Sequence, residues 1–198
     1  MEGQNRYFAI MEMAESRSLD ESSLDQLLSN KALIPKPTRP CVFLSHKSGD
    51  KLAVKAIGNY VKKRGVDIYL DVDDPSLRQA VEDDDHVAIT KSIELGIHAS
   101  TDLMTLISEI TKNSWWVPYE IGFAKSEQKY LSTLKLKSVS HIPSFLKITK
   151  LLKSAKDLDQ YIDEVKSRNK VYGKVAILLN EITRPSLDTL TNYLNITA

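Results

Sequence analysis

Short apolar runs alternate with amphipathic stretches of helical period along most of this chain, from Cys41 to about Ser167. The apolar runs predict strands over 41–45, 66–70, 102–108, 130–136 and 144–148. The amphipathic stretches predict helices over 50–64, 89–99, 115–128 and 157–167. Strands that alternate with helices are joined by right-handed crossovers, and this produces a parallel sheet covered by helices on both faces. The sequence therefore predicts an α/β fold with a central parallel sheet of about five strands.

The segments on either side of this unit lack the alternation. Before it, the stretch 18–34 predicts a short amphipathic helix, and a connector over 35–40 alternates proline with polar residues and is therefore stiff. After it come an apolar run over 175–179 and a helix predicted over 185–194. We expect an N-terminal extension (1–40), a main domain (41–168) and a C-terminal extension (169–198) that resembles an appended cap.

The composition narrows the class of protein. Apolar residues make up 42% of the chain and charged residues 27%, with a net charge of +1, so nothing in the balance favours nucleic acid. The one cysteine, Cys41, lies in an apolar run, which indicates an inert buried thiol in a reducing compartment. No run approaches the ~18 apolar residues of a membrane span, and early acidic residues argue against a signal peptide. We expect a cytoplasmic protein that binds neither nucleic acid nor membrane.

The strongest functional signal is the segment 114–124, Ser-Trp-Trp-Val-Pro-Tyr-Glu-Ile-Gly-Phe-Ala, which follows the third predicted strand and contains both tryptophans. Ser114 is a fair N-cap for the helix that follows. Trp116 and Glu120 are four residues apart, so on a helix they share one side. An indole beside a carboxylate suits a ligand with rings, hydroxyl groups or a positive charge. From the spacing alone, a core tryptophan beside a solvated glutamate is the commoner arrangement.

Three predicted loops share one edge of the expected sheet. Ligands of parallel sheets bind beyond the carboxyl ends of the strands, which places the loops 45–50, 71–85 and 109–114 around one site. The loop 71–85 is long and acidic, with a helical turn as an open alternative in its middle. Its run 82–85 is expected to open a solvated helix rather than to hold a metal, because no well-spaced partner ligands accompany it. We expect no metal site in this chain.

Four pieces of the chain, taken in order and with their spacing, resemble a TIR domain: 42–46, 65–71, 107–108 and the motif 116–120. The resemblance covers 41 to about 167. The Ser-Trp-Trp-Val-Pro-Tyr-Glu-Ile-Gly form is similar to bacterial TIR proteins, including those of Thoeris-type anti-phage defence systems. The resemblance implies a flavodoxin-like three-layer fold and cleavage of NAD at the nicotinamide–ribose bond. NAD is then the substrate, and no cofactor is implied.

The resemblance also implies the site residues. Glu120 matches the catalytic glutamate of a Trp-x-x-x-Glu motif. In TIR domains the loop after the first strand lines the substrate site, and the loop after the second strand serves self-assembly and gating. The residues expected to bind substrate are Trp116, Ser45, His46, Lys47 and Asp71. Glu94, in the helix before the third strand, is the fallback carboxylate, and no partner is predicted for His86, His98 or His141.

Three functions remain open from the sequence. An NAD-consuming enzyme would release, cyclise or transfer ADP-ribose, either to make a signal that an effector protein senses or to deplete NAD in anti-phage immunity. An adaptor would act by TIR–TIR assembly without turnover, and its tryptophan and glutamate would only brace the fold. A nucleoside-processing enzyme of similar sheet topology would also need a carboxylate at a strand end.

Overall fold

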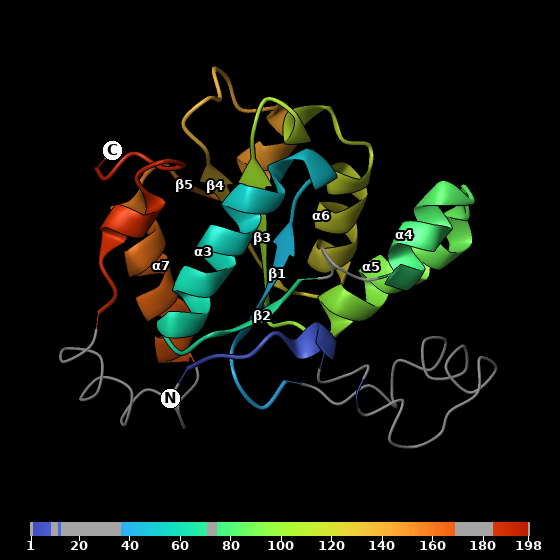
Figure 1. Cartoon of the computed structure of the whole chain (residues 1–198), viewed down its shortest axis with the longest axis horizontal. Coiled ribbons are helices and arrows are strands. Elements are labelled where there is room, and N and C mark those ends of the chain that lie inside the picture. Colours follow the sequence, from blue (N-terminus) through green and yellow to red (C-terminus); the bar gives the residue numbers. More distant parts are fainter. Residues whose placement is uncertain (1, 9–11, 13–36, 71–74, 169–183, 198) are drawn as a thin grey trace.

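Five parallel strands form the centre of the computed structural model, which describes residues 2–8, 12, 37–70, 75–168 and 184–197. The strands are β1 (Cys41–Ser45), β2 (Asp67–Tyr69), β3 (Asp102–Ile107), β4 (Tyr130–Lys135) and β5 (Lys150–Leu152). Their order across the sheet is β2-β1-β3-β4-β5, and every neighbouring pair is parallel (Figure 1). This is the flavodoxin-like order, so the predicted parallel α/β sheet is confirmed.

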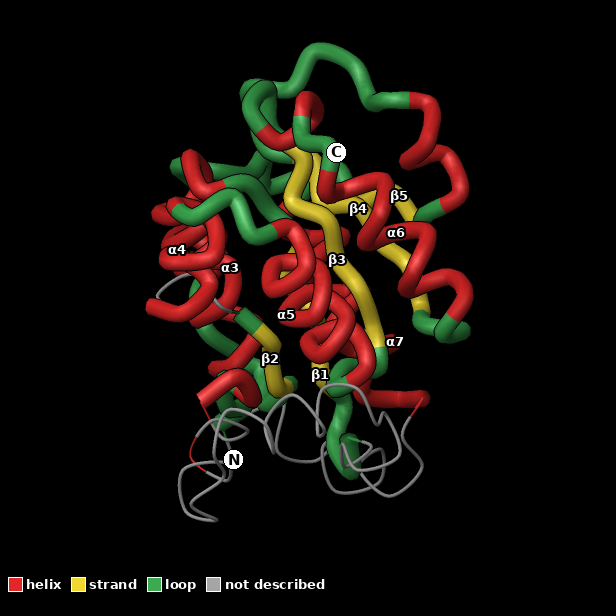
Figure 2. The backbone as a smooth tube through the Cα atoms, turned by 90° about the vertical axis from the view of Figure 1, so that its right-hand side faces the viewer, coloured by secondary structure: helices red, strands yellow, loops and turns green. Residues whose placement is uncertain are grey.

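Helices cover both faces of the sheet and make three layers (Figure 1). On one face lie α3 (Lys51–Lys63) and α7 (Ala155–Arg168), and on the other lie α5 (His86–His98) and α6 (Trp116–Ser126). Figure 2 looks onto the face that carries α5 and α6. A further helix, α4 (Pro75–Glu82), forms a hairpin with α5 at the right of Figure 1. No helix within these described ranges is long and apolar enough to cross a membrane.

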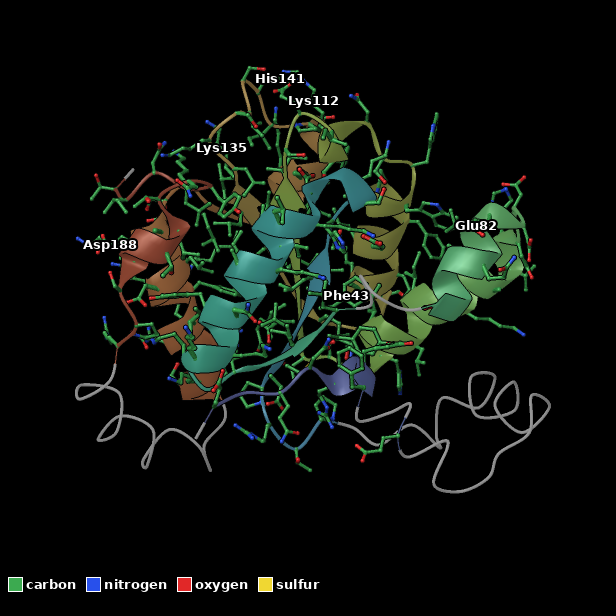
Figure 3. All side chains as sticks on the ribbon, in the orientation of Figure 1. Phe43, Glu82, Lys112, Lys135, His141 and Asp188 are labelled. Carbon is green, nitrogen blue, oxygen red and sulfur yellow. The ribbon has the colours of Figure 1, made fainter. Side chains whose placement is uncertain are left out.

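Two apolar cores flank the sheet because side chains along a strand alternate between its faces. In β1, Val42 and Leu44 belong to the core beneath α3 and α7, whereas Cys41 and Phe43 belong to the core beneath α5 and α6. Figure 3 shows Phe43 in the interior between the sheet and its helices. Every residue of β1 is buried, as expected for a central parallel strand that carries apolar residues on both faces.

The fifth strand lies later than the sequence predicted. Residues Ser144–Ile148 form a 3-10 helix, and the strand is β5, which pairs with β4 through Ser132 and Lys150. Thr149 ends the 3-10 helix by donating its hydroxyl hydrogen bond to Leu146 O at 2.7 Å. A short apolar run has no periodicity that separates a strand from a helical turn, so only pairing with β4 decides which residues form the strand.

The middle of the stretch 71–85 is helical, as the open alternative allowed, and forms the eight-residue helix α4. This helix ends in a turn where Asp84 has a positive φ of 56° and Asp85 N donates to Ala80 O at 2.8 Å. Asp85 then caps α5, since its Oδ1 accepts from Val87 N and Ala88 N at 3.0 Å each. Of the acidic run 82–85, the last residue therefore opens a helix as predicted, whereas Glu82 ends α4, and α5 begins three residues before the predicted start.

Both ends of the chain pack on the main domain where the structure describes them. Of the helix predicted over 185–194, only Leu187–Leu190 is helical, as a 3-10 turn. The predicted helix over 18–34 and the apolar run over 175–179 lie outside the described residues. The boundaries at 40 and 168 stay predictions.

Candidate active site

Ser45 and Glu120 meet at the carboxyl end of the central strand. Ser45 is the last residue of β1, and Glu120 lies in the second turn of α6. The Ser45 hydroxyl donates a short hydrogen bond to Glu120 Oε2. Glu120 is 6% exposed, which is rare for a glutamate, and the hydroxyl offsets part of the cost of removing the carboxylate from water. The fold thus aims a buried carboxylate at the edge where ligands of such sheets bind.

His46 and Lys47, the two residues after β1, are held by different hydrogen bonds. His46 is half-buried, and its Nδ1 lies 3.0 Å from Leu44 O. With Nδ1 as the donor, Nε2 is left as the acceptor of the ring. Lys47 donates its backbone N–H to Thr111 Oγ1 at 3.2 Å, while its side chain is exposed. Asp71, the remaining candidate of the rim, lies outside the described residues.

Trp116 belongs to a row of aromatic side chains on α6. Its ring lies 6.1 Å from that of Tyr119 in an edge-on arrangement, and Tyr119 stacks on Phe123 at 6.3 Å. The Trp116 ring also lies 6.1 Å from the ring of His86, the first residue of α5. The indole predicted beside Glu120 is therefore part of a wall that reaches toward α5.

The helix that carries this motif begins one residue later than expected. Trp115 is the N-cap residue and makes no side-chain cap, so the predicted cap by Ser114 is wrong. A 3-10 turn precedes α6, and Ser114 N donates to Thr111 O at 2.9 Å within it. That turn holds Ser114 in an extended conformation ahead of the helix. Trp115 itself is 92% exposed.

A polar cluster that the sequence did not reveal joins the loops after β1 and β3. Asp50 Oδ2 accepts from Ser108 Oγ at 2.5 Å and from Thr111 Oγ1 at 2.6 Å. Ser108 Oγ in turn accepts from the backbone N–H groups of Ile110 and Thr111 at 3.1 and 2.9 Å. The polar residues after each strand were visible in the sequence, but their pairing depends on β1 and β3 being neighbours in the sheet.

The fallback carboxylate has a different partner. Glu94 Oε1 accepts from the Tyr119 hydroxyl at 2.6 Å. Burial and this carboxylate raise the pKa of Tyr119 to about 12. Glu94 of α5 therefore braces that helix against α6 through Tyr119, the residue that precedes Glu120.

The three histidines without a predicted partner also find neighbours. His86 lies 3.4 Å from Asp84, and His98 lies 3.2 Å from Glu127. His141 lies 3.5 Å from the hydroxyl of the preceding residue, Ser140, and Figure 3 shows it at the upper edge near Lys112. Among the described residues, no group of three or more His, Cys, Asp or Glu is placed to hold a metal ion.

Cys41 lies at the other end of β1 from Ser45. Its side chain is fully buried, and burial raises the pKa of the thiol to about 12. A thiol that stays protonated is a poor nucleophile, so Cys41 packs as a small apolar residue.

Residues 43–140 match the family model described as "Thoeris protein ThsB, TIR-like domain". This chain carries a TIR-like domain of the Thoeris ThsB type. The match begins in β1 and ends after β4, so it contains both Ser45 and Glu120. No curated protein matches the chain. A buried carboxylate that accepts a hydrogen bond from a hydroxyl group, as Glu120 does from Ser45, is a chemical group suited to stabilising positive charge.

Proposed function

We propose that this TIR-like domain cleaves the nicotinamide–ribose bond of NAD+ in Thoeris anti-phage defence. The observation that carries the proposal is the buried Glu120 carboxylate, held by Ser45 at the carboxyl end of β1. In hydrolysis, NAD+ and water give nicotinamide, ADP-ribose and a proton. In cyclisation or transfer, a nucleophile of ADP-ribose or of an acceptor takes the place of water.

The chemistry suits a single carboxylate. Breaking the bond leaves positive charge on the ribose, as in glycoside hydrolysis. Nicotinamide leaves as a neutral base, so no general acid is required. A fixed anion at this position interacts more strongly with the transition state than with the ground state. Glu120 supplies the anion, and Ser45 holds the carboxylate in place.

The neighbouring residues have proposed roles in binding NAD. Trp116 stacks on a ring of the substrate, Lys47 meets a phosphate as a point charge, and His46 offers Nε2 to a hydroxyl group. Asp71 contributes from the loop after β2. NAD is the substrate, and the reaction needs no cofactor.

The remaining parts of the proposal concern the cell. The protein acts in the cytoplasm, associates with further copies through its TIR-like domain, and makes an ADP-ribose product for an effector protein or depletes NAD. The adaptor alternative keeps the association and removes the turnover.

Glu120→Gln tests the proposed function, because it keeps the shape of the side chain and removes its charge. Purified wild type is expected to release nicotinamide from NAD, with the product identified by chromatography and mass. Glu120→Gln is expected to lower the rate by at least about 100-fold with unchanged thermal unfolding. Glu94→Gln is the matched control and keeps most of the activity.

Other results would change the assignment. Loss of activity in Glu94→Gln alone would move the site to Glu94. Absence of nicotinamide release from wild type over a wide range of protein concentrations would favour the adaptor. Faster release of bases from nucleosides than of nicotinamide from NAD would favour the nucleoside-processing enzyme.

A further inference from the structure

The N-terminal residues lie along the outer edge of β2 (blue, Figure 1). Gly3 N donates to Lys62 O at 2.7 Å, and Ile68 N donates to Gln4 O at 2.8 Å. Asn5 pairs with Ile68 in a parallel bridge. The edge strand of a sheet carries unpaired backbone groups that invite pairing with another chain. Residues 3–5 occupy that edge in this protein.

The fit of this segment is close. A Cβ atom at Gly3 would lie 2.0 Å from Val66 O, a distance at which no side chain can be accommodated without moving the backbone. Gln4 N also donates to Asp67 Oδ1 at 3.0 Å. The backbone of residues 3–4 is therefore hydrogen-bonded to Lys62 at the end of α3 and to Asp67 and Ile68 of β2.

The Asn5 carboxamide forms hydrogen bonds with both backbone groups of Leu70. Its Nδ2 donates to Leu70 O at 2.8 Å, and Leu70 N donates to Asn5 Oδ1 at 3.1 Å. Leu70 follows the last residue of β2, so one carboxamide supplies the pairing that a neighbouring strand would give. Leu70 also precedes the segment 71–74 that connects to α4. Asn5 thus holds the chain at the point where it leaves the sheet toward the α4–α5 hairpin.

Tyr7 reaches that hairpin through Tyr69, whose ring lies against Gly96 of α5. The Tyr7 ring packs edge-on against Tyr69 at 6.0 Å, and Tyr7 is only 6% exposed. It belongs to the core cluster that contains Ala80 of α4 and Ile89 and Ile93 of α5. At the far end of the hairpin, the first residue of α5 lies against Trp116 of α6.

We propose that residues 3–7 are a strap that positions the α4–α5 hairpin against α6, with Asn5 as the positioning residue. The strap holds the base of the hairpin through Leu70 and Tyr69, and the hairpin in turn packs on Trp116 through His86. Its effect on turnover rests on the proposed function, whereas its effect on Trp116 does not.

Fluorescence of Trp116 tests the strap directly. Trp115→Phe leaves Trp116 as the only tryptophan, and this variant serves as the background. Adding Asn5→Ala removes both hydrogen bonds to Leu70. Acrylamide quenching of Trp116 is expected to increase about twofold, and deuterium uptake over 75–86 is expected to rise. Gln4→Ala is the matched control, because the bonds of Gln4 come from its backbone and its side chain is exposed.

Asn5→Asp is the second variant, since it keeps the acceptor for Leu70 N and loses the donor to Leu70 O. It is expected to give an intermediate effect, and it decides the question if Asn5→Ala does not fold. Folded variants with the quenching and uptake of the background would overturn the strap, as would equal changes in Gln4→Ala. Thermal unfolding is measured in parallel, because a purely structural role lowers stability without exposing Trp116 in the folded state.

Kinetics with NAD extend the test to the site. The KM of Asn5→Ala is expected to rise about fivefold with kcat within about twofold, because Ser45 and Glu120 are untouched. A raised quenching with an unchanged KM would overturn the link between the strap and substrate binding. Absence of turnover in every variant would refute the proposed function, and the fluorescence result would still decide the strap.

Discussion

At the scale of single residues, the two candidate carboxylates, Glu120 and Glu94, have different environments. Glu120 is buried and accepts a hydrogen bond from Ser45, whereas Glu94 is only half-buried and accepts from the Tyr119 hydroxyl. A buried carboxylate interacts with a nearby charge through little water, so its electrostatic effect on a ligand exceeds that of a carboxylate that is more accessible to solvent. This contrast is why Glu120 is the proposed catalytic residue.

Ser45→Ala separates the two members of this pair. Removing the hydroxyl leaves Glu120 Oε2 buried with one donor fewer, which is expected to lower the free energy of unfolding by about 1–2 kcal/mol. Nicotinamide release from NAD is expected to fall about tenfold, because the carboxylate is less well placed. Ser48→Ala, in the exposed part of the same loop, is expected to change neither quantity. An unchanged rate in Ser45→Ala would show that Glu120 needs no support from β1.

At the scale of elements, the start of α5 depends on one side chain. Asp85 accepts from two backbone N–H groups of the first turn, and these donors have no partner inside the helix. Asp85→Ala is expected to lower the free energy of unfolding by about 1 kcal/mol, measured by urea denaturation. Asp83→Ala is the control from the same turn. Equal stability of the two variants would contradict the capping role.

Helix α7 carries an ionic cluster that faces α3. Arg64, the C-cap residue of α3, is buried and pairs with Asp159 and Asp163 of α7. Arg184, from the C-terminal segment, pairs with the same two carboxylates at 2.8 and 2.9 Å. Lys166 is also buried in this region, and burial followed by the charge of Arg64 lowers its pKa to about 8.

The low pKa of Lys166 predicts how stability changes with pH. Between about 8 and the ordinary value of 10.5, the unfolded chain binds a proton that native Lys166 does not, so the contribution of Lys166 to the free energy of unfolding rises with pH. Lys166→Met is therefore expected to be about 1 kcal/mol more stable than wild type at pH 7, with an advantage that shrinks toward pH 10. Lys156→Met, exposed on the same helix, is the control. If the free energies of unfolding of wild type and Lys166→Met changed equally with pH, this account would be contradicted.

At the scale of the whole molecule, the C-terminal segment completes the core beneath α3 and α7. Leu190 and Leu194 are fully buried in that core. Ala155 N donates to Asn195 O at 2.7 Å and Lys156 N donates to Ile196 O at 3.1 Å, so the segment also satisfies the first turn of α7. Where the structure describes it, this segment therefore packs against the main domain and shares its core.

Leu194→Ala tests the contribution of the segment. Loss of a fully buried leucine is expected to lower the free energy of unfolding by about 2–4 kcal/mol, measured by thermal or urea denaturation. Ile196→Ala, two residues later and 41% exposed, is expected to cost much less. Similar values for the two would show that the segment adds little to the core.

Much of the fold could be predicted because it follows from local pattern. Apolar runs such as those of β1 and β3 alternate along the sequence with amphipathic segments such as α3. A parallel sheet covered by helices is the arrangement that buries the apolar residues of both kinds of segment. The 3-10 helix before β5 and the cap of α6 could not be predicted. Each depends on a turn or on a pairing between segments that local pattern does not contain.

For the candidate site, the sequence by itself determined which residue types stand at the ends of the strands and at the start of α6, because chain order and helical spacing are local properties. Tertiary structure alone decided that Ser45 reaches Glu120, that Asp50 joins two loops, and that Asn5 lies against Leu70. These pairs lie 58 to 75 positions apart in the sequence. Such contacts form only when the sheet has set the order of its strands, since no short-range pattern encodes which strand becomes the neighbour of which.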